Sequence, residues 1–226
     1  MNALKLLVVA AWEPELVRFR ERLAGGLPGP DVEIVLETLG VGLIEAAIST
    51  TQCVVRHRPD YALLIGTCGV FPGAGEVRPG AVVAGARVGL ADASMQRGAA
   101  ALPEPMPSDA LFDGALHDAL VAAGARSVQI ANTLGITTED ELAVQLAAGG
   151  FDVEHLEALS FARACARAGV PCGAALGIAN VVGSKGRAEW LAGHVEASAS
   201  AADLAYAALA GATLRSSTTE RSPGRA

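Results

Sequence analysis

The chain contains at residues 61–69 the stretch YALLIGTCG, which decides the fold class. A short apolar run over residues 61–65 is typical of a strand that is buried on both faces of a parallel sheet, and Gly66 ends the run. Parallel sheets bind small molecules beyond the carboxyl ends of their strands. Thr67, which lies between glycines at this strand end, is therefore predicted to lie close to a ligand.

Short apolar runs alternate with longer helical patterns in both directions from this stretch. On the N-terminal side we predict strands over 4–10 and 32–39 and helices over 13–24 and 43–56. On the C-terminal side the pattern predicts, in order, strand structure over 77–88, an irregular excursion over 95–107 that could cover a site, a helix over 109–123, a strand over 127–134, a helix capped by threonine at 137–140, a helix over 155–168, a buried strand between 171 and 179, and a helix over 188–214. This alternation predicts an α/β fold with a mostly parallel sheet.

The composition favours one folded domain. Hydrophobic residues make up 51% of the 226 residues and charged residues 18%, and no Ser/Pro-rich or charge-rich stretch divides the interior. We therefore expect a single domain over residues 1–214. The remaining residues, 215–226, are rich in Ser, Thr, Pro, Gly and Arg and are expected to be disordered.

Charge and cysteine usage exclude several classes of function. There are 17 basic and 24 acidic residues, a formal net charge of −7, so nucleic acid is not an expected partner. The four cysteines lack the paired spacing of a zinc site and the four histidines are dispersed, so no metal is predicted. The apolar run over residues 6–11 is interrupted by Glu13, and we expect no signal peptide, no membrane anchor and a cytoplasmic location.

Two later segments contain the polar residues that a nucleoside site needs. Residues 152–160 read DVEHLEALS, and Glu157 at the predicted helix start can accept two hydrogen bonds from the vicinal diol of a ribose. Asn180 follows a predicted strand and can reach the edge of a base. Glu15, just after the first strand, can orient or activate water. All three residues are predicted near strand or helix ends on one side of the sheet.

The order of these segments resembles the nucleoside phosphorylase and nucleosidase superfamily, in the branch that contains methylthioadenosine/adenosylhomocysteine nucleosidase and futalosine hydrolase. The resemblance spans about residues 4–210. Its motifs are AWEPE at 11–15, GVG at 40–42 followed by two alanines at 46–47, GTCG at 66–69, GAVV at 80–83, VEHLEA at 153–158 and the loop at Asn180. The resemblance implies a three-layer α/β/α sandwich with a mixed, mostly parallel sheet, a homo-oligomer, a small-molecule purine nucleoside as ligand and no cofactor.

The resemblance also implies roles for individual residues. Glu15 and Asn180 take the catalytic positions, Glu15 as the carboxylate that activates water. At the Asn180 position methylthioadenosine nucleosidases carry an aspartate that delivers a proton to the purine, and an amide cannot act as that acid. The substrate-binding positions are Thr67, Cys68 and Gly69 in the wall of the pocket, and Leu156 with Glu157 at the ribose. Leu156 stands where the family usually has methionine.

Residues 178–183, IANVVG, with Trp190 downstream, are similar to futalosine hydrolases, and so is the strand end LAD at 90–92. This similarity implies hydrolysis of futalosine to hypoxanthine and dehypoxanthine futalosine, a step of menaquinone biosynthesis. Three positions depart from that pattern: Leu176 where an arginine is common, EALS instead of EGAA at 157–160, and SKG at 184–186.

Other interpretations stay open at this stage. The alternatives are a methylthioadenosine/adenosylhomocysteine nucleosidase, a phosphate-dependent purine nucleoside phosphorylase and a nucleoside-binding homologue without activity. Neither glycine loop brings a cation to the pocket, and Arg87 is the best candidate for an anion contact, so water is favoured over phosphate as the nucleophile. Taken alone, Glu157 could instead be a helix-terminal carboxylate, His155 a structural residue and Cys68 a buried thiol.

Overall fold

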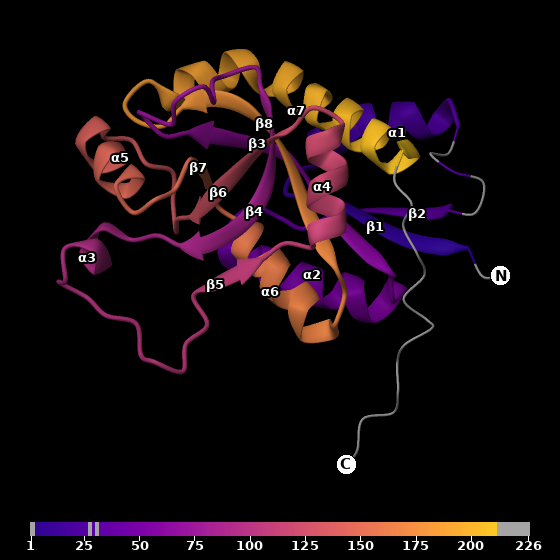
Figure 1. Ribbon diagram of the computed structural model, residues 1–226, viewed down its shortest axis with the longest axis horizontal. Helices are drawn as coiled ribbons and strands as arrows, with labels where there is room; N and C mark the ends of the chain where they lie inside the picture. The colour runs from indigo at the N-terminus through magenta and orange to yellow at the C-terminus, as the bar shows by residue number, and fades with distance from the viewer. Residues whose placement is uncertain (1–2, 27–28, 30–31, 212–226) are drawn as a thin grey trace.

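The computed structural model describes residues 3–26, 29 and 32–211, in which an eight-stranded mixed sheet lies between helices (Figure 1). The strands are β1 (Leu4–Ala10), β2 (Val32–Thr38), β3 (Tyr61–Val70), β4 (Val82–Leu90), β5 (Asp109–Leu111), β6 (Arg126–Asn132), β7 (Val153–His155) and β8 (Cys172–Val181). Their order is β2-β1-β3-β7-β6-β4-β5, and β8 pairs with both β3 and β4. The predicted disordered tail, 215–226, lies outside the described residues.

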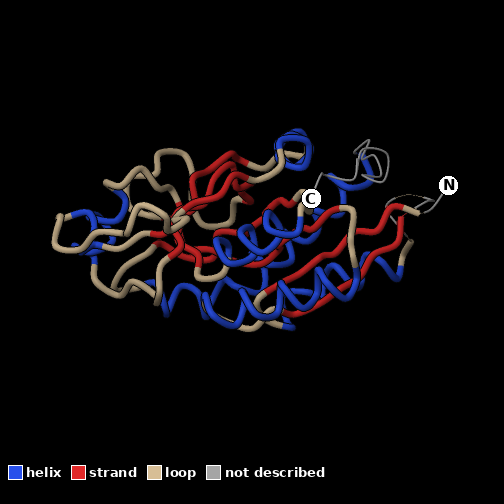
Figure 2. Tube along the Cα trace, turned by 90° about the horizontal axis from the view of Figure 1, so that it is seen from below, coloured by secondary structure: helices blue, strands red, loops and turns tan. Residues whose placement is uncertain are grey.

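The helices cover both faces of the sheet, as the sequence predicts. They are the 3-10 helix η1 (Glu13–Leu16) and α1 (Val17–Ala24), α2 (Leu43–His57), α3 (Ala93–Gln96), α4 (Gly114–Ala122), α5 (Asp140–Ala147), α6 (Ala158–Ala168) and α7 (Gly186–Gly211). α1, α4 and α7 lie on one face and α2 and α6 on the other, and Figure 2 shows strands running between helices. The three-layer α/β/α sandwich with a mixed sheet is therefore confirmed. In the described part of the chain, no helix is long and apolar enough to cross a membrane.

Alternate residues of β1 enter two different hydrophobic cores. Leu7 and Val9 pack with the α2 and α6 side, which includes Phe161. Leu6 and Val8 pack with the α1, α4 and α7 side. A strand covered on both faces reads as a continuous apolar run without polar alternation, which is why the strand pattern was visible in the sequence.

The end of β3 joins segments that are far apart in the chain. Gly69 is in register with Glu154 on the antiparallel neighbour β7 and with Asn180 on the parallel neighbour β8. The register between β3 and β8 shifts at Cys68 and Gly69, where the ladder is irregular. The polar side chains at 153–157 and the Asn180 loop therefore meet at the carboxyl end of β3.

Several predicted elements differ from the structure. β3 continues through the glycines to Val70, because β7 and β8 pair with its extension. The predicted helix 109–123 is the short strand β5 followed by α4, whose first turn is capped by the Asp113 side chain accepting from the Leu116 N–H group. The strand predicted over 77–88 is β4, which begins at Val82.

The region before α6 was also predicted with the wrong elements. The predicted helix 155–168 begins only at Ala158, because residues 153–155 pair with β3 and β6 as β7. Thr137 does not cap α5, which begins at Asp140, because its hydroxyl and amide both bind Glu154. The excursion over 95–107 contributes Met106 to a separate groove beside α2 and α6 and does not cover the cavity described below.

Candidate active site

A cavity of about 450 Å³ opens at the carboxyl ends of β1, β3 and β8. All seven predicted site residues line it: Glu15, Thr67, Cys68, Gly69, Leu156, Glu157 and Asn180. The other lining residues are Ala11, Trp12, Val41, Ile136, Glu154, His155, Gly186, Arg187, Trp190, Leu191 and His194. The fold thus brings the two predicted acids and the predicted amide to one cavity, although they are far apart in the sequence.

Glu15 is a buried carboxylate at the β1 end of the cavity. It lies in η1, is 7% exposed, and its Oε1 accepts hydrogen bonds from the Thr67 N–H group (2.9 Å) and the Thr67 hydroxyl (2.8 Å). Burial raises the pKa of Glu15 to about 7, the Glu157 carboxylate adds to the rise, and the Thr67 hydrogen bonds oppose it. A carboxylate with a pKa near neutrality can take up and release a proton at physiological pH.

Gly66 makes room for this carboxylate. Its φ is +151°, and a Cβ atom at this position would lie 2.8 Å from Glu15 Oε2 and 3.0 Å from Oε1. The absence of a side chain at Gly66 therefore lets the Glu15 carboxylate lie directly against the backbone of β3, with its Oε1 at the Thr67 amide.

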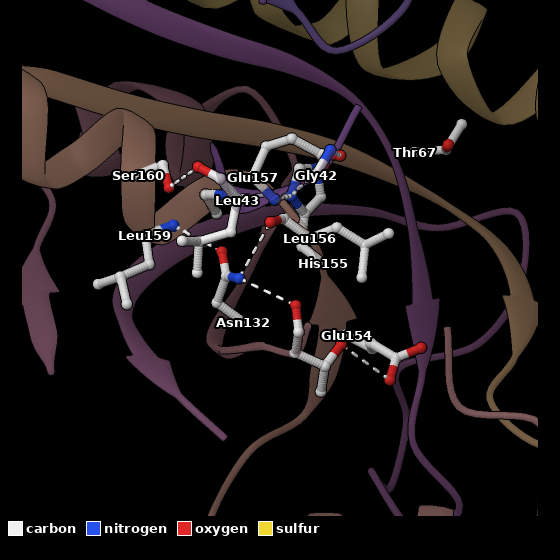
Figure 3. A network of polar contacts seen from close by, with 12 residues as sticks. Gly42, Leu43, Thr67, Asn132, Glu154, His155, Leu156, Glu157, Leu159 and Ser160 are labelled. Atoms are coloured by element: carbon white, nitrogen blue, oxygen red, sulfur yellow. Dashed lines mark hydrogen bonds and ion pairs between the residues drawn. The ribbon is translucent and has the colours of Figure 1, made fainter. Parts of the chain in front are cut away.

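Glu157 also lines the cavity, at the start of α6, and is 4% exposed. Its Oε1 accepts a hydrogen bond of 2.6 Å from the N–H group of Gly42, the residue that precedes α2 (Figure 3). The φ of +93° at Gly42 directs the chain into α2 at this point. The Gly40–Gly42 loop, which follows β2, thus fixes one oxygen of the Glu157 carboxylate.

His155 Nδ1 lies at the N-terminus of α6, 3.1 Å from each of the Glu157 and Ala158 backbone N–H groups. The same nitrogen lies 3.1 Å from Glu157 Oε2, which would be an ion pair only if the imidazole were charged. Burial lowers the pKa of His155, so we assign the neutral ring, with Nδ1 accepting from the amides and the proton on Nε2. His155 therefore supports the helix start, which agrees with the structural interpretation of this residue.

Two buried polar residues, Asn132 and Ser160, hold the Leu156–Glu157 segment and the start of α6 in place. Neither was predicted as a site residue. Asn132, at the end of β6, donates to the Leu156 carbonyl (3.0 Å) and accepts from the Leu159 N–H group (2.9 Å). The Ser160 hydroxyl donates to the Leu43 carbonyl, which ties α6 to α2 (Figure 3). An asparagine near the end of a predicted strand is the one sign of this role in the sequence. Its hydrogen-bond partners could not be predicted, because they are determined by tertiary contacts.

Asn180 lies at the end of β8 and is 9% exposed. Its Nδ2 donates to the Val181 carbonyl (2.9 Å). An amide nitrogen carries two hydrogens, so the second donor and the Oδ1 acceptor stay available on the cavity side. Gly69 and Gly186 leave room for this side chain, since a Cβ atom at either position would lie 3.0 Å from Nδ2.

An aromatic group at the cavity mouth was not predicted as part of the site. Trp190 stacks on His194 with ring centroids 4.1 Å apart and lies 6.1 Å from Trp12, and the Arg187 guanidinium lies over the Trp190 ring. The Trp190 Nε1–H group donates to the Thr67 hydroxyl (3.2 Å), so the aromatic group is connected to Glu15 through Thr67. In the sequence, Trp190 was noted only as part of the resemblance to futalosine hydrolases.

Two further predicted residues have other surroundings. Cys68 is buried, and burial raises the pKa of its thiol far above the ordinary value, so it stays protonated and lines the wall as a small apolar group. Arg87 pairs with Asp109 at the exposed β4–β5 edge and does not line the cavity. Arg87 as an anion contact in the cavity is therefore wrong.

The chain belongs to the Phosphorylase superfamily, whose family model matches residues 12–215. Among curated proteins it is similar to the futalosine hydrolase of Thermus thermophilus, with 29% identity over 169 residues that cover 70% of this chain and 73% of that protein. It is also similar to the 5'-methylthioadenosine/S-adenosylhomocysteine nucleosidase of Bacillus velezensis, with 34% identity over 82 residues. That alignment covers 30% of this chain and 35% of the relative.

Solved structures of nucleosidases share the fold. The Helicobacter pylori 5'-methylthioadenosine/S-adenosylhomocysteine nucleosidase, in complex with a pyrrolopyrimidine ligand, has a TM-score of 0.83 at 14% identity and covers 92% of this chain and 99% of its own. The native futalosine hydrolase of the same organism has a TM-score of 0.81 at 14% identity, covering 92% and 97%. The Colwellia psychrerythraea nucleosidase in complex with adenine has a TM-score of 0.79 at 17% identity, covering 92% and 95%.

Proposed function

We propose that this protein is a nucleosidase that hydrolyses the N-glycosidic bond of a purine nucleoside, with futalosine as its substrate and hypoxanthine and dehypoxanthine futalosine as its products. The observation that carries the proposal is the convergence of Glu15, Glu157 and Asn180 on one cavity. The relatives that share the fold and family include both futalosine hydrolases and methylthioadenosine nucleosidases.

In the proposed reaction, Glu157 binds the ribose. The Gly42 N–H group holds its Oε1, and Oε2 accepts hydrogen bonds from the sugar hydroxyls. As the sugar becomes an oxocarbenium ion, its positive charge makes the bound hydroxyls stronger hydrogen-bond donors to the carboxylate, so the interaction strengthens in the transition state. Glu157 thus contributes to binding and to lowering the barrier.

Glu15 activates the water that attacks the anomeric carbon. Its ionised form takes a proton from water as the new carbon–oxygen bond forms and the bond to the purine nitrogen breaks. A pKa of about 7 suits this role, because the carboxylate is both a stronger base than an ordinary glutamate and substantially ionised at neutral pH. Thr67 keeps the carboxylate in position through two hydrogen bonds.

Asn180 stabilises the departing base by donating a hydrogen bond near N7, where negative charge accumulates. It cannot protonate the base, so the base leaves as an anion and takes its proton from solvent, and Glu15 returns the proton that it took from water to solvent. This favours a 6-oxopurine such as hypoxanthine over adenine, because the residue that protonates adenine in the methylthioadenosine nucleosidase pattern is missing. The choice of futalosine therefore rests on Asn180, which stands where the methylthioadenosine nucleosidase pattern has an aspartate.

Water is favoured over phosphate as the nucleophile. Phosphorolysis needs cationic side chains and amides around the phosphate. Arg187 is the one Lys or Arg side chain among the described residues that line the cavity, and it lies over Trp190 at the mouth. This distribution leaves the region between Glu15 and Glu157 anionic, which disfavours a phosphate there.

Incubation with futalosine, methylthioadenosine, adenosylhomocysteine and inosine, with and without phosphate, followed by detection of free base, tests the proposal. We expect release of hypoxanthine from futalosine at a rate independent of phosphate. Release of adenine instead identifies a methylthioadenosine-type nucleosidase, and strict phosphate dependence with formation of ribose 1-phosphate identifies a phosphorylase. Calorimetric binding without product identifies a non-catalytic nucleoside-binding protein, and each of these three outcomes contradicts the proposal.

A further inference from the structure

The side chain of Trp190 is joined to Glu15 by two consecutive hydrogen bonds. Its Nε1–H group donates to the Thr67 hydroxyl (3.2 Å), and this hydroxyl donates to Glu15 Oε1 (2.8 Å). Trp190 lies near the start of α7 and Thr67 lies on β3, so the two bonds connect a helix to the strand beneath it. The reaction described above gives Trp190 no role.

The donors and acceptors of these groups allow one arrangement of hydrogens around Thr67. An indole N–H group can only donate, so the Thr67 oxygen accepts from Trp190. A hydroxyl has a single hydrogen and an ionised carboxylate can only accept, so this hydrogen points to Glu15 Oε1. Trp190 thus occupies an acceptor position of Thr67 and polarises its hydroxyl toward Glu15, because consecutive hydrogen bonds strengthen one another.

The same arrangement distinguishes the two oxygens of the Glu15 carboxylate. Oε1 accepts from the Thr67 hydroxyl and from the Thr67 N–H group (2.9 Å). A proton on Oε1 would compete with these donors, and the Thr67 hydroxyl could not turn its hydrogen toward Trp190 instead, because the indole does not accept. A proton therefore binds more favourably at Oε2 than at Oε1.

Packing holds the Trp190 ring in place for this bond. The ring stacks on His194, about one turn further along α7, with centroids 4.1 Å apart, and the Arg187 guanidinium lies 4.9 Å from the ring centroid. The start of α7 is tied to the end of β8, where the Glu189 carboxylate accepts from the Val181 N–H group (2.9 Å). A donor fixed in this way loses little conformational freedom when it makes its hydrogen bond.

We propose that Trp190 is a positioning residue that orients the Thr67 hydroxyl toward Glu15 and so favours the ionised carboxylate, whose Oε2 takes the proton from water. The inference rests on the proposed function, because it assumes that Glu15 activates water. Trp190 acts through Thr67 and needs no contact with the reacting atoms.

The other charged groups around Glu15 do not replace this contribution. The Glu157 carboxylate raises the pKa of Glu15, the Thr67 hydrogen bonds lower it, and the buried Cys68 thiol on β3 stays protonated. In the described residues, the charged side chains of β1, η1, α1 and the start of α7 have other partners: Lys5 with Glu33, Glu13 with Arg20, Arg18 with Glu21 and Asp203, Arg22 with Asp203, Glu189 with the Val181 amide, and Arg187 and His194 with the Trp190 ring.

The test measures the pKa of Glu15 by carbon-13 NMR titration of the glutamate carboxyl groups, with the Glu15 signal assigned from its loss in Glu15→Gln. Trp190→Phe keeps a ring that can stack on His194 and removes the donor. We expect the Glu15 pKa to rise by about 0.5, and kcat/KM to fall about threefold near pH 6 and little on the alkaline plateau. Tyr206→Phe on the same helix removes a hydroxyl that donates to the Gly26 carbonyl, and this control should change neither value.

A second background separates positioning from a merely structural role. In Thr67→Val the hydroxyl is absent, so Trp190→Phe should cause no further change in the Glu15 pKa, whereas Thr67→Ser keeps the hydroxyl and should keep the full effect. The same rise in the wild-type and Thr67→Val backgrounds, or an unchanged Glu15 pKa in Trp190→Phe, overturns the inference. Trp190→Met, which also lacks the donor, takes the place of Trp190→Phe if that variant does not fold.

The NMR titration also separates this inference from the proposed function. If the wild-type protein hydrolyses no nucleoside, the proposed function fails, while a higher Glu15 pKa in Trp190→Phe still supports the positioning role of Trp190. If hydrolysis proceeds and the Glu15 pKa is unchanged in this variant, only the inference fails.

Discussion

The cavity has two acidic ends that are constructed differently. At one end, Glu15 accepts hydrogen bonds from the Thr67 amide and hydroxyl, and burial brings its pKa to about 7. At the other end, Glu157 is fixed by an amide of the α2 start, and the surrounding backbone is fixed by His155 and Asn132. The difference suits the proposed roles, because the pKa of Glu15 allows it to exchange a proton, whereas backbone groups hold Glu157 in one position for the proposed ribose.

The largest effect is expected at the proton-exchanging end. Glu15→Gln keeps the shape and the acceptor for Thr67 but cannot take a proton from water, so turnover should fall by about 10³-fold. Release of free base measures the activity, and circular dichroism should show an unchanged fold. Glu13→Gln, an exposed neighbour in η1, is the control and should retain activity. Turnover retained in Glu15→Gln would mean that the reaction does not need proton exchange at Glu15.

The pH dependence of stability should also depend on Glu15. Its pKa is higher in the folded state than the ordinary 4.5, so the folded protein binds more protons between about pH 4.5 and 7 and becomes less stable as the pH rises through this range. The full contribution is about 3 kcal/mol. Denaturant unfolding should show that Glu15→Gln is more stable than the wild type at pH 8, by up to this amount, with the difference shrinking toward pH 4.5.

In the wild-type protein, kcat/KM should rise with pH to a plateau above an apparent pKa near 7, because the ionised Glu15 carboxylate is the active form. A stability difference that is independent of pH, or a kcat/KM that falls through this range, would mean that Glu15 does not exchange a proton as proposed.

At the other end, Glu157→Gln should reduce kcat/KM ten- to a hundredfold, because a neutral amide accepts fewer and weaker hydrogen bonds from the ribose diol. The Gly42 N–H group keeps an acceptor in this variant, so the fold should persist. The measurement is the ratio of kcat/KM for a ribonucleoside and its 2'-deoxy counterpart, which should narrow in the variant. An unchanged ratio would mean that Glu157 does not bind the sugar.

The position of Glu15 against β3 can be tested through Gly66. Gly66→Ala places a Cβ atom 2.8 Å from Glu15 Oε2 at a φ of +151°, and we expect a loss of about 2 kcal/mol of stability together with reduced activity. Gly135→Ala is the control, since no atom lies within 4 Å of its Cβ position. Unfolding curves of equal midpoint for the two variants would contradict the close approach.

The smallest effect is expected at Leu156, where the family usually has methionine. Leu156→Met conserves apolar volume, and its cost in stability should be less than about 1.5 kcal/mol. Neither end of the cavity is altered, so turnover should stay close to that of the wild type. A large gain in turnover would show that the methionine thioether contributes to catalysis and that Leu156 lowers the turnover of the wild-type protein.

Much of the fold and of the site followed from the sequence, for physical reasons. β1 and β3 are covered on both faces, so their apolar runs were visible, and Glu15, Glu157 and Asn180 lie at element ends where ligands bind. β7 was not visible, because three residues carry no periodicity and its pairing with β3 is long-range.

The hydrogen bonds of Glu154 and Asn132 could not be predicted for a related reason. Their partners, Thr133 and Thr137 for one and Leu156 and Leu159 for the other, are determined by the tertiary fold rather than by sequence spacing. Trp12 and Trp190 form the cavity mouth only because α7 returns beside η1. Local patterns thus located the predicted site residues, but not the buried polar residues that hold neighbouring segments in place.

The exposed segment 97–107 divides the chain into a part that contains Glu15 and Thr67 and a part that contains Glu154, Glu157 and Asn180. A polypeptide cut within this segment would yield two fragments, neither with a complete active centre. Enzyme activity would return only on reassembly of the sheet, when β8 docks against β3. If the proposed function holds, the two fragments would form a split reporter whose signal is the release of a purine.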